Sequence, residues 1–291
     1  MQINTNVNQR YLITGATGSI GALVVKRLLK QGIRPRVFVR DVGKAKRLYH
    51  HGVDIAMGDL TDEASLAAAL AGIETMFLVN AGPDLATRDG SAAQVALSAG
   101  VERIVKLSTI DVEQGVGTGV WHAQGEAAIR ATGIGFTFVR PSGFMSNALF
   151  WARSIATAGV VRAATGEGKI AFIHPDDIAD AVAAALITPD YNRESLSISG
   201  PAALSYAEMT AIIGEVIGRP LRFEPMNEEE ARRQLIANGD QRESVDYHLS
   251  IFRAIREDRM GIVTDTIRRV LGRPPLSFKH WVEENAAQFS A

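Results

Sequence analysis

The chain has 291 residues, of which 46% are hydrophobic, so it is long enough for an α/β domain with a smaller attached lobe. Its 31 basic and 32 acidic side chains nearly cancel, which argues against nucleic acid or an anionic membrane surface as a partner. The absence of cysteine excludes disulfides, thiolate metal sites and a cysteine nucleophile, and no run of about 18 apolar residues occurs. We therefore expect a cytoplasmic protein with a small-molecule partner, and predict no oligomeric state.

Short β-branched runs alternate with segments of helical period from residue 10 to about 140. Strands that are apolar on both faces, in this alternation, are typical of a parallel sheet covered by helices on both sides. We therefore predict an α/β fold with a Rossmann-like, doubly wound parallel sheet. The predicted strands are 10–14, 35–40, 53–57, 74–79, 102–108 and 134–140, and the predicted helices are one that begins near Ile20, 43–50, 62–71, 86–99 and 122–132.

After residue 140 the alternation ends, and the pattern indicates a smaller, mainly helical C-terminal lobe. Asp176 and Asp177 precede apolar positions of helical spacing, which predicts a capped helix that packs back on the sheet. The predicted domains are 1–145 for the Rossmann part and 146–291 for the lobe, with parts of about 169–199 returning to the sheet. The other predicted helices are 145–158, 205–217, 227–238, 243–257 and 277–288, and the predicted short strands are 169–173, 195–199 and 221–224.

The segment TGATGSIG, residues 14 to 21, links the first predicted strand to the first predicted helix. Gly15 allows a tight turn, Gly18 lets backbone N–H groups approach a pyrophosphate, and Gly21 allows close packing of helix on strand. This setting favours a dinucleotide site over a tight turn without a ligand. The expected cofactor contacts in the loop are Gly15, Thr17, Gly18, Ser19 and Ile20.

The end of the second predicted strand indicates which dinucleotide binds. An NAD-selective site places an acid there, whereas this chain has Arg40 followed by Asp41. A guanidinium pairs with a 2′-phosphate, so Arg40 favours NADP(H) over NAD(H), with Lys44 as a candidate second cation. We interpret Asp41 as the N-cap of the helix 43–50.

Gly58-Asp59-Leu60 ends the third predicted strand, at the height where an adenine edge would lie. Asp59 is either an adenine contact or the cap before the next helix, and the sequence leaves both interpretations open.

Together these motifs resemble the short-chain dehydrogenase/reductase superfamily. The resemblance is carried by TGATGSIG, VFVR, GDL, Asn80-Ala81-Gly82, FVRP and FIHPDDIADAV, and the combination of GATGxxG with Val-Arg is similar to the atypical NmrA-like branch. That branch includes type 2 quinone oxidoreductases, triphenylmethane reductases, imine-reducing relatives and non-catalytic redox sensors. The resemblance implies NADP(H) binding, with Leu60, Asn80, Ala81, Gly82 and the turn at Pro141 as further cofactor contacts.

The catalytic signature of the wider superfamily, Tyr-x-x-x-Lys, is absent, because no tyrosine of this chain has a lysine four residues later. The corresponding predicted helix carries His122 and Glu126, one turn apart on one face. His122 is a candidate contact to the nicotinamide side or the substrate, and a structural His122–Glu126 pair is the alternative. Ser108 and Thr109 end the fifth predicted strand, where either could hydrogen-bond a substrate or cap the loop.

Phe144 and Trp151 share a predicted helical face that would wall a flat substrate pocket, although an aromatic stripe is also typical of a core. The glycine-rich residues 115–119 are expected to form a mobile loop over the site. The six histidines lack the spacing of a metal site, and no G-x-S-x-G motif occurs, so neither metal chemistry nor a hydrolase is expected.

We therefore expect an NADPH-dependent reductase that transfers hydride to an already electrophilic small molecule: a quinone, an enone, an imine or iminium ion, or a cationic dye. Without a tyrosine acid, the rate would depend on proximity in a dry pocket. Any proton would come from water, His122 or Ser108. The alternative is a non-catalytic NADP(H)-binding redox sensor that acts on a protein partner.

Overall fold

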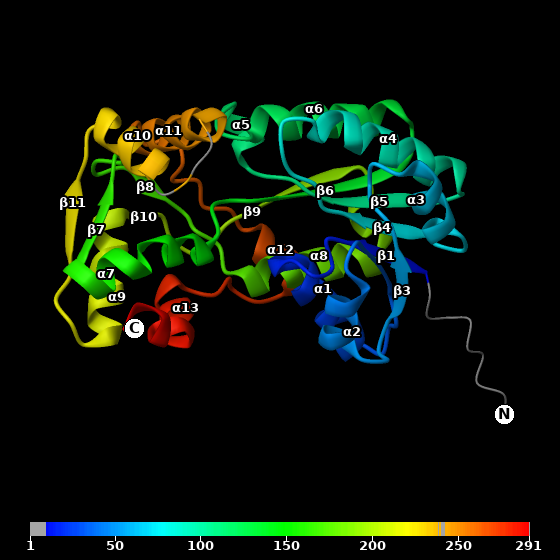
Figure 1. Cartoon of the computed structure of the whole chain (residues 1–291), viewed down its shortest axis with the longest axis horizontal. Helices are drawn as coiled ribbons and strands as arrows, with labels where there is room; N and C mark the ends of the chain where they lie inside the picture. The colour runs from blue at the N-terminus through cyan, green and yellow to red at the C-terminus, as the bar shows by residue number, and fades with distance from the viewer. Residues whose placement is uncertain (1–9, 238, 240–241, 291) are drawn as a thin grey trace. The chain divides into compact units, whose positions relative to one another are not determined.

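A computed structural model describes residues 10–237, 239 and 242–290, and these residues form two compact units (Figure 1). The first unit contains the described residues up to Thr109 together with Trp121–Arg140 and Ile178–Leu196. The second unit contains Ile110–Val120, Pro141–Asp177 and the described residues from Ser197 onward. The chain thus passes repeatedly from one unit to the other, and the expected domain boundary at residue 145 stays a prediction.

Within the described residues, the main sheet has seven strands in the order β3-β2-β1-β4-β5-β6-β9. The pairings that join β3 through to β6 are all parallel. The strand order reverses between β1 and β4, which is the topology of a doubly wound, Rossmann-like fold, and this confirms the predicted fold class. The strands are β1 (Tyr11–Thr14), β2 (Arg36–Val39), β3 (Asp54–Met57), β4 (Thr75–Leu78), β5 (Arg103–Leu107), β6 (Gly135–Pro141) and β9 (Glu194–Ile198).

Helices cover both faces of this sheet. Consecutive strand residues such as Leu12 and Ile13 point to opposite faces, and both side chains are fully buried. Figure 1 shows α3, α4 and α6 along one face, and α1 and α8 along the other. The helices are α1 (Ser19–Lys30), α2 (Val42–Tyr49), α3 (Glu63–Leu70), α4 (Leu85–Ser98), α6 (Gly119–Ala131) and α8 (Pro175–Ile187), followed by the 3₁₀ turn η3 (Pro189–Tyr191).

Acidic side chains lie at the start of two helices for which the sequence predicted a cap. Asp41 accepts a hydrogen bond from the backbone N–H of Lys44 at 2.8 Å, which confirms its interpretation as the N-cap of α2. Asp176 and Asp177 occupy the first turn of α8, where negative charge stabilises a helix. The first half of the chain therefore folds much as its local pattern predicts.

The second unit is mainly helical, with two small two-stranded sheets. The predicted strand 169–173 is wrong in extent, because only two residues of it are strand and Ile173 makes an isolated bridge. The predicted helix 145–158 begins as a 3₁₀ turn, and residue 238 of the predicted helix 227–238 lies outside the described residues. The elements are α5 (Asp111–Gln114), η2 (Met145–Trp151), α7 (Ala152–Ala158), β7 (Val160–Ala163), β8 (Lys169–Ile170), β10 (Leu204–Ser205), α9 (Tyr206–Ile217), β11 (Arg222–Pro225), α10 (Glu228–Ala237), α11 (Arg242–Arg256), α12 (Thr266–Leu271), α13 (Phe278–Asn285) and η4 (Ala286–Phe289).

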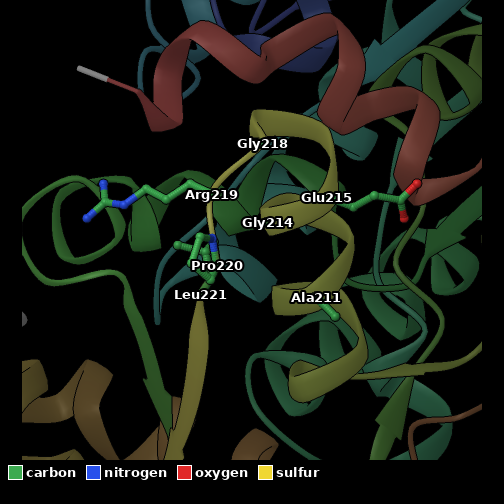
Figure 2. Close-up of a pocket in the computed structure, with 7 residues that line it drawn as sticks. All are labelled: Ala211, Gly214, Glu215, Gly218, Arg219, Pro220 and Leu221. Carbon is green, nitrogen blue, oxygen red and sulfur yellow. The ribbon is translucent and has the colours of Figure 1, made fainter.

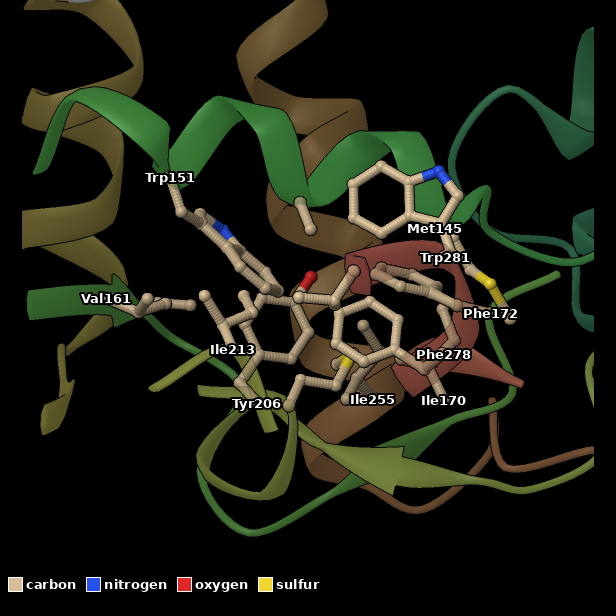
Figure 3. Packing of buried hydrophobic residues seen from close by; sticks show 14 of the residues in the cluster. Met145, Trp151, Val161, Ile170, Phe172, Tyr206, Ile213, Ile255, Phe278 and Trp281 are labelled. Atoms are coloured by element: carbon tan, nitrogen blue, oxygen red, sulfur yellow. The ribbon is translucent and has the colours of Figure 1, made fainter. Parts of the chain in front are cut away.

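An aromatic cluster forms the core of the second unit (Figure 3). Trp151 is 9% exposed, and its ring centroid lies 4.9 Å from that of Tyr206, in a tilted arrangement that aromatic pairs favour. Trp151 therefore packs in the core of this unit, the alternative that the sequence left open, and its role in walling a substrate pocket stays a prediction. Phe144, on the same predicted face, is only half-buried.

Candidate functional site

The glycine loop between β1 and α1 closes on itself. Gly15 has a φ of +60°, a conformation that favours glycine, and the N–H of Gly18 donates to the Gly15 carbonyl at 2.9 Å. A Cβ atom at Gly21 would lie 2.1 Å from the same carbonyl oxygen, so only glycine lets the helix begin this close to the loop. A Cβ atom at Gly18 would lie 3.2 Å from the Gly15 carbonyl oxygen, so the protein itself restricts a side chain less at Gly18 than at Gly21.

The N-terminus of α1 is free to bind an anion. Within the described residues, no side chain makes a capping hydrogen bond at its N-cap, Gly18, and the first turn holds no acidic residue. The first N–H groups of a helix have no partner inside it, and together with the helix dipole they attract phosphate. The cradle thus fits a pyrophosphate. Thr17 is half-buried and Ser19 is exposed, and their contacts to the cofactor stay predictions. Ile20 is buried in the core, so any contact that it makes to a phosphate would come from its backbone.

The carboxyl ends of β2 and β3 bring a cation and an acid together. The side chain of Arg40 is 85% exposed, and its guanidinium lies 3.7 Å from an oxygen of Asp59. Asp59 also accepts hydrogen bonds from the backbone N–H and hydroxyl of Thr61, at 2.9 and 2.8 Å, and these bonds lower the pKa of Asp59. Asp59 therefore closes the turn at Thr61, whereas the N-cap of the next helix, α3, is Asp62, and an adenine contact of Asp59 stays a prediction. Lys44 is exposed and Leu60 half-buried, so both stay candidates.

The segment after β4 is held by side chains of α4. The Asn80 amide donates to Asp89 at 3.2 Å, and its oxygen accepts the N–H of Ala81 at 3.0 Å. Asp89 in turn lies 2.5 Å from the ammonium group of Lys106, on β5. Gly82 follows with a φ of +103°. Sequence patterns missed both Asp89 and Lys106, although a lysine within the apolar run Ile104–Leu107 was a signal that could have been noticed.

Ser108 and Glu126 form a second buried polar group. The Ser108 hydroxyl donates to Glu126 at 2.7 Å. Arg140 binds both oxygens of the same carboxylate, at 2.9 and 2.5 Å, and Arg130 approaches at 3.2 Å. Glu126 is thus fully occupied by Ser108 and two arginines, so the proposed His122–Glu126 pair is wrong. These arginines were the second set of residues that sequence patterns missed.

His122 lies in the first turn of α6, where it is half-buried. Its Nδ1 atom is buried and has no hydrogen-bond partner within the described residues. Burial, together with the positive charge of Lys106, lowers the pKa of His122 to about 3. The imidazole is therefore neutral at neutral pH and does not hold a proton to donate as an imidazolium.

The remaining predicted residues divide between the two units. Thr109 belongs to the first unit and is half-buried, whereas Pro141, Phe144 and Trp151 belong to the second. The Pro141 carbonyl accepts the N–H of Ile110 at 2.9 Å, so that this backbone oxygen already has a hydrogen-bond partner.

The first unit brings the glycine loop, Arg40, Asn80, Ser108 and His122 to the carboxyl ends of its strands.

The loop 115–119 is tied to α11 within the second unit. The N–H of Gly117 donates to the hydroxyl of Ser250 at 2.9 Å. A Cβ atom at Gly117 would lie 2.6 Å from Ile251, so glycine allows this close approach. The expected mobility of this loop stays a prediction.

A hollow at the end of α9 is unrelated to these groups. Figure 2 shows Glu215 and Arg219 pointing away from each other on its two sides. Glu215 is already paired with Lys279 at 2.6 Å, and Arg219 donates to the Ala156 carbonyl at 3.2 Å. The hollow therefore presents no free group for catalysis. Its lining residues are Ala211, Gly214, Glu215, Gly218, Arg219, Pro220 and Leu221.

The described part of the chain offers neither a metal site nor a membrane span. Within residues 10–237, 239 and 242–290, no three acidic or histidine side chains are grouped in a way that could hold a metal ion. Over the same residues, every helix is too short or too polar to cross a membrane.

Comparison with known proteins shows similarity over nearly the whole chain. A model of the NmrA-like family matches residues 7–262. A (4-alkanoyl-5-oxo-2,5-dihydrofuran-3-yl)methyl phosphate reductase of Streptomyces griseus is 36% identical, over 96% of this chain and 99% of that protein. An NAD(P)H azoreductase of Xenophilus azovorans is 32% identical over the same shares. An NADPH complex of a quinone oxidoreductase of Escherichia coli has the same fold, with a TM-score of 0.88 at 24% identity over 94% of this chain and 99% of that one.

Proposed function

The chain belongs to the NmrA-like family, and we propose that it is an NADPH-dependent oxidoreductase that transfers hydride to an electrophilic small molecule. The observation that carries the proposal is the uncapped N-terminus of α1 behind a closed glycine loop, with the exposed Arg40 at the end of β2. The similarity of almost the whole chain to two named reductases supports the same function.

Each part of this arrangement has a role in binding the cofactor. The N–H groups of the first turn of α1 would hold the pyrophosphate, since nothing in the described chain caps them. The guanidinium of Arg40 would pair with the 2′-phosphate, which NADPH has and NADH lacks. When bound, NADPH would supply the hydride. Loop 80–82, at the carboxyl end of β4, would then lie on the side away from Arg40, because β1 separates β2 from β4.

The class of acceptor follows from the state of three candidate proton donors at the described strand ends, none of which is a free acid. His122 is neutral, Glu126 is bound by two arginines, and the proton of Ser108 is donated to Glu126. A simple ketone needs a proton donor as it accepts hydride, whereas a conjugated electrophile spreads the charge over its own atoms. We therefore propose a quinone, a conjugated enone or lactone, an azo compound, or an iminium or cationic dye as the acceptor. The names of the two reductase relatives, one of an azo compound and one of an oxo-dihydrofuran, agree with this class.

The test is oxidation of NADPH by the purified protein in the presence of one acceptor from each class, compared with NADH. We expect at least one conjugated acceptor to be reduced, faster with NADPH, and cyclohexanone not to be reduced. Tight binding of NADP⁺ by calorimetry, with no oxidation by any acceptor, would contradict the enzyme and indicate the redox sensor. No binding of either dinucleotide would contradict the site itself.

A further inference from the structure

A fully buried ion pair lies beside the carboxyl end of β4. Lys106 and Asp89 are both 0% exposed, and their charged atoms are 2.5 Å apart. Removal of two charges from water is costly, and an apolar pair of similar volume often gives equal or greater stability. Stability alone is therefore a poor explanation for this pair, and its neighbours indicate another role.

The second oxygen of Asp89 connects the pair to the loop after β4. It accepts a hydrogen bond from the Asn80 amide at 3.2 Å, and the amide oxygen of Asn80 accepts the N–H of Ala81 at 3.0 Å. The preceding residue of α4, Arg88, donates to the Ala81 carbonyl and to Asp84. Two successive side chains of α4 thus hold the same short loop.

This loop lies where open α/β sheets bind ligands. The strand order reverses between β1 and β4, and ligands bind beyond the carboxyl ends of the strands at such a reversal. The side chain of Val79 packs against Gly15, because a Cβ atom added at Gly15 would lie 3.0 Å from the Val79 side chain. Asn80 therefore follows directly on a residue in contact with the glycine loop.

The same pair also adjoins the helix that carries His122. A Cβ atom at Gly125 of α6 would lie 2.4 Å from an oxygen of Asp89, so glycine allows α6 to approach the carboxylate closely. His122 lies one turn earlier in α6, and the positive charge of Lys106, together with burial, lowers its pKa. Asp89 is thus in contact with β5, the loop after β4 and α6 at once.

We propose that Asp89 and Lys106 are positioning residues for hydride transfer, which fix the Asn80 loop on which the nicotinamide half of the dinucleotide rests. Lys106 holds the Asp89 carboxylate in one place, and Asp89 orients the Asn80 amide and the backbone at Ala81. The adenosine half belongs on the other side of β1, with Arg40. This inference rests on the proposed function.

Two double variants test the proposal without leaving a lone buried charge. Asp89→Asn with Lys106→Gln replaces the ion pair by two amides, so that an oxygen at position 89 still accepts from Asn80. Asp89→Leu with Lys106→Met removes both the charges and the acceptor. Because neither variant holds an unpaired charge, both are expected to fold, which circular dichroism and thermal unfolding would check.

Three measurements separate positioning from general structure: the Kd for 2′,5′-ADP, which carries only the adenosine half; the fluorescence of bound NADPH, which reports on the nicotinamide; and kcat. The leucine–methionine variant is expected to lose about 10- to 100-fold in kcat, because small misplacements of reacting groups cost this much. It should also change the fluorescence of bound NADPH, with the Kd for 2′,5′-ADP within about twofold of wild type. The amide variant should stay close to wild type in all three.

Unchanged kcat and fluorescence in the folded leucine–methionine variant would overturn the proposal. Equal losses in kcat and in 2′,5′-ADP affinity would also overturn it, since they would show a general structural role. Failure of the proposed function would look different, because the wild type would then oxidise no NADPH. In that case the fluorescence of bound NADPH in the two variants still decides whether the pair positions the nicotinamide half.

Discussion

The phenolic hydroxyl of Tyr49 donates a hydrogen bond to the backbone carbonyl of Ala16, within the glycine loop. Tyr49 is the last residue of α2 and is 6% exposed. Burial raises the pKa of Tyr49 to about 12, so the hydroxyl remains a protonated donor at neutral pH. The helix that begins two residues after Arg40 thus ends on the loop that would hold the pyrophosphate, and α2 links these two parts of the proposed site.

Tyr49→Phe removes this hydrogen bond and leaves the ring in place. One neutral hydrogen bond contributes about 0.5 to 1.5 kcal/mol, so we expect the Kd for NADPH to rise roughly 2- to 13-fold. The kcat at saturating NADPH should be unchanged, because the reacting groups lie elsewhere. Calorimetry and steady-state kinetics would measure the two effects. Tyr11→Phe, at the amino end of β1, is the matched control. Equal losses of NADPH affinity in the two variants would refute a specific role for Tyr49.

Arg40→Ala should weaken NADPH binding and leave NADH binding almost unchanged. The guanidinium would lose a charge-assisted contact to the 2′-phosphate, which contributes about 1.5 to 3 kcal/mol, or roughly 10- to 150-fold in Kd. Lys44→Ala removes another exposed cation, which lies in the first turn of α2, and tests the second candidate contact separately. Equal effects of Arg40→Ala on both cofactors would show that Arg40 acts through Asp59 or the adenine ring and not through the 2′-phosphate.

Gly18→Val and Gly21→Val should both lose NADP⁺ binding, but for different reasons. At Gly18 a Cβ would lie 3.2 Å from the Gly15 carbonyl oxygen, a tight contact that a shift of a few tenths of an ångström would relieve, so the variant should fold and yet exclude the pyrophosphate. At Gly21 the Cβ would lie 2.1 Å from the Gly15 carbonyl, so that variant should lose stability as well. Thermal unfolding and calorimetry with NADP⁺ would compare the two. Near wild-type NADP⁺ affinity of Gly18→Val would contradict the assignment of the cradle to the pyrophosphate.

The sequence was sufficient for the sheet and the glycine loop because both depend on local patterns. Short β-branched runs and apolar positions of period 3.6 are set by neighbouring residues, and Gly15 and Gly21 are required by backbone geometry within eight residues. The buried polar groups depend instead on contacts across the fold. Lys106 meets Asp89 and Ser108 meets Glu126 only once α4 and α6 pack on β5, so no local pattern indicates the partners.

The second unit was predicted less well for a related reason. Its strands β8 and β10 have two residues each, which is too short for a period-2 pattern to show. Trp151 has the same apolar spacing whether it lines a pocket or packs in a core, and only its contact with Tyr206, far along the chain, shows that it packs in the core.

The stability of the protein should depend on His122 in mildly acidic solution. Because the pKa of His122 is about 3 in the folded chain and ordinarily about 6.5, the unfolded chain binds the proton more readily. The contribution of the neutral histidine to the free energy of unfolding is therefore complete above pH 6.5 and is lost as the pH falls towards 3. Compared with His122→Phe, the free energy of unfolding of the wild type should fall by on the order of 1 kcal/mol between pH 6.5 and 5.5. Urea unfolding at each pH measures this, His122→Leu should give the same slope as His122→Phe, and parallel pH profiles of wild type and both variants would contradict the low pKa.

The same neutral state decides what His122 can do in catalysis. A positioned acid typically contributes about 10²- to 10⁴-fold, but His122 carries no extra proton between pH 5 and 8. We therefore expect His122→Phe to lower kcat less than about 100-fold, to a similar degree for a neutral enone and for a cationic dye. Neither acceptor should show a pH–rate limb in that range that His122→Phe abolishes. A loss of 100-fold or more confined to the enone, together with a limb that vanishes in the variant, would show that His122 donates the proton after all.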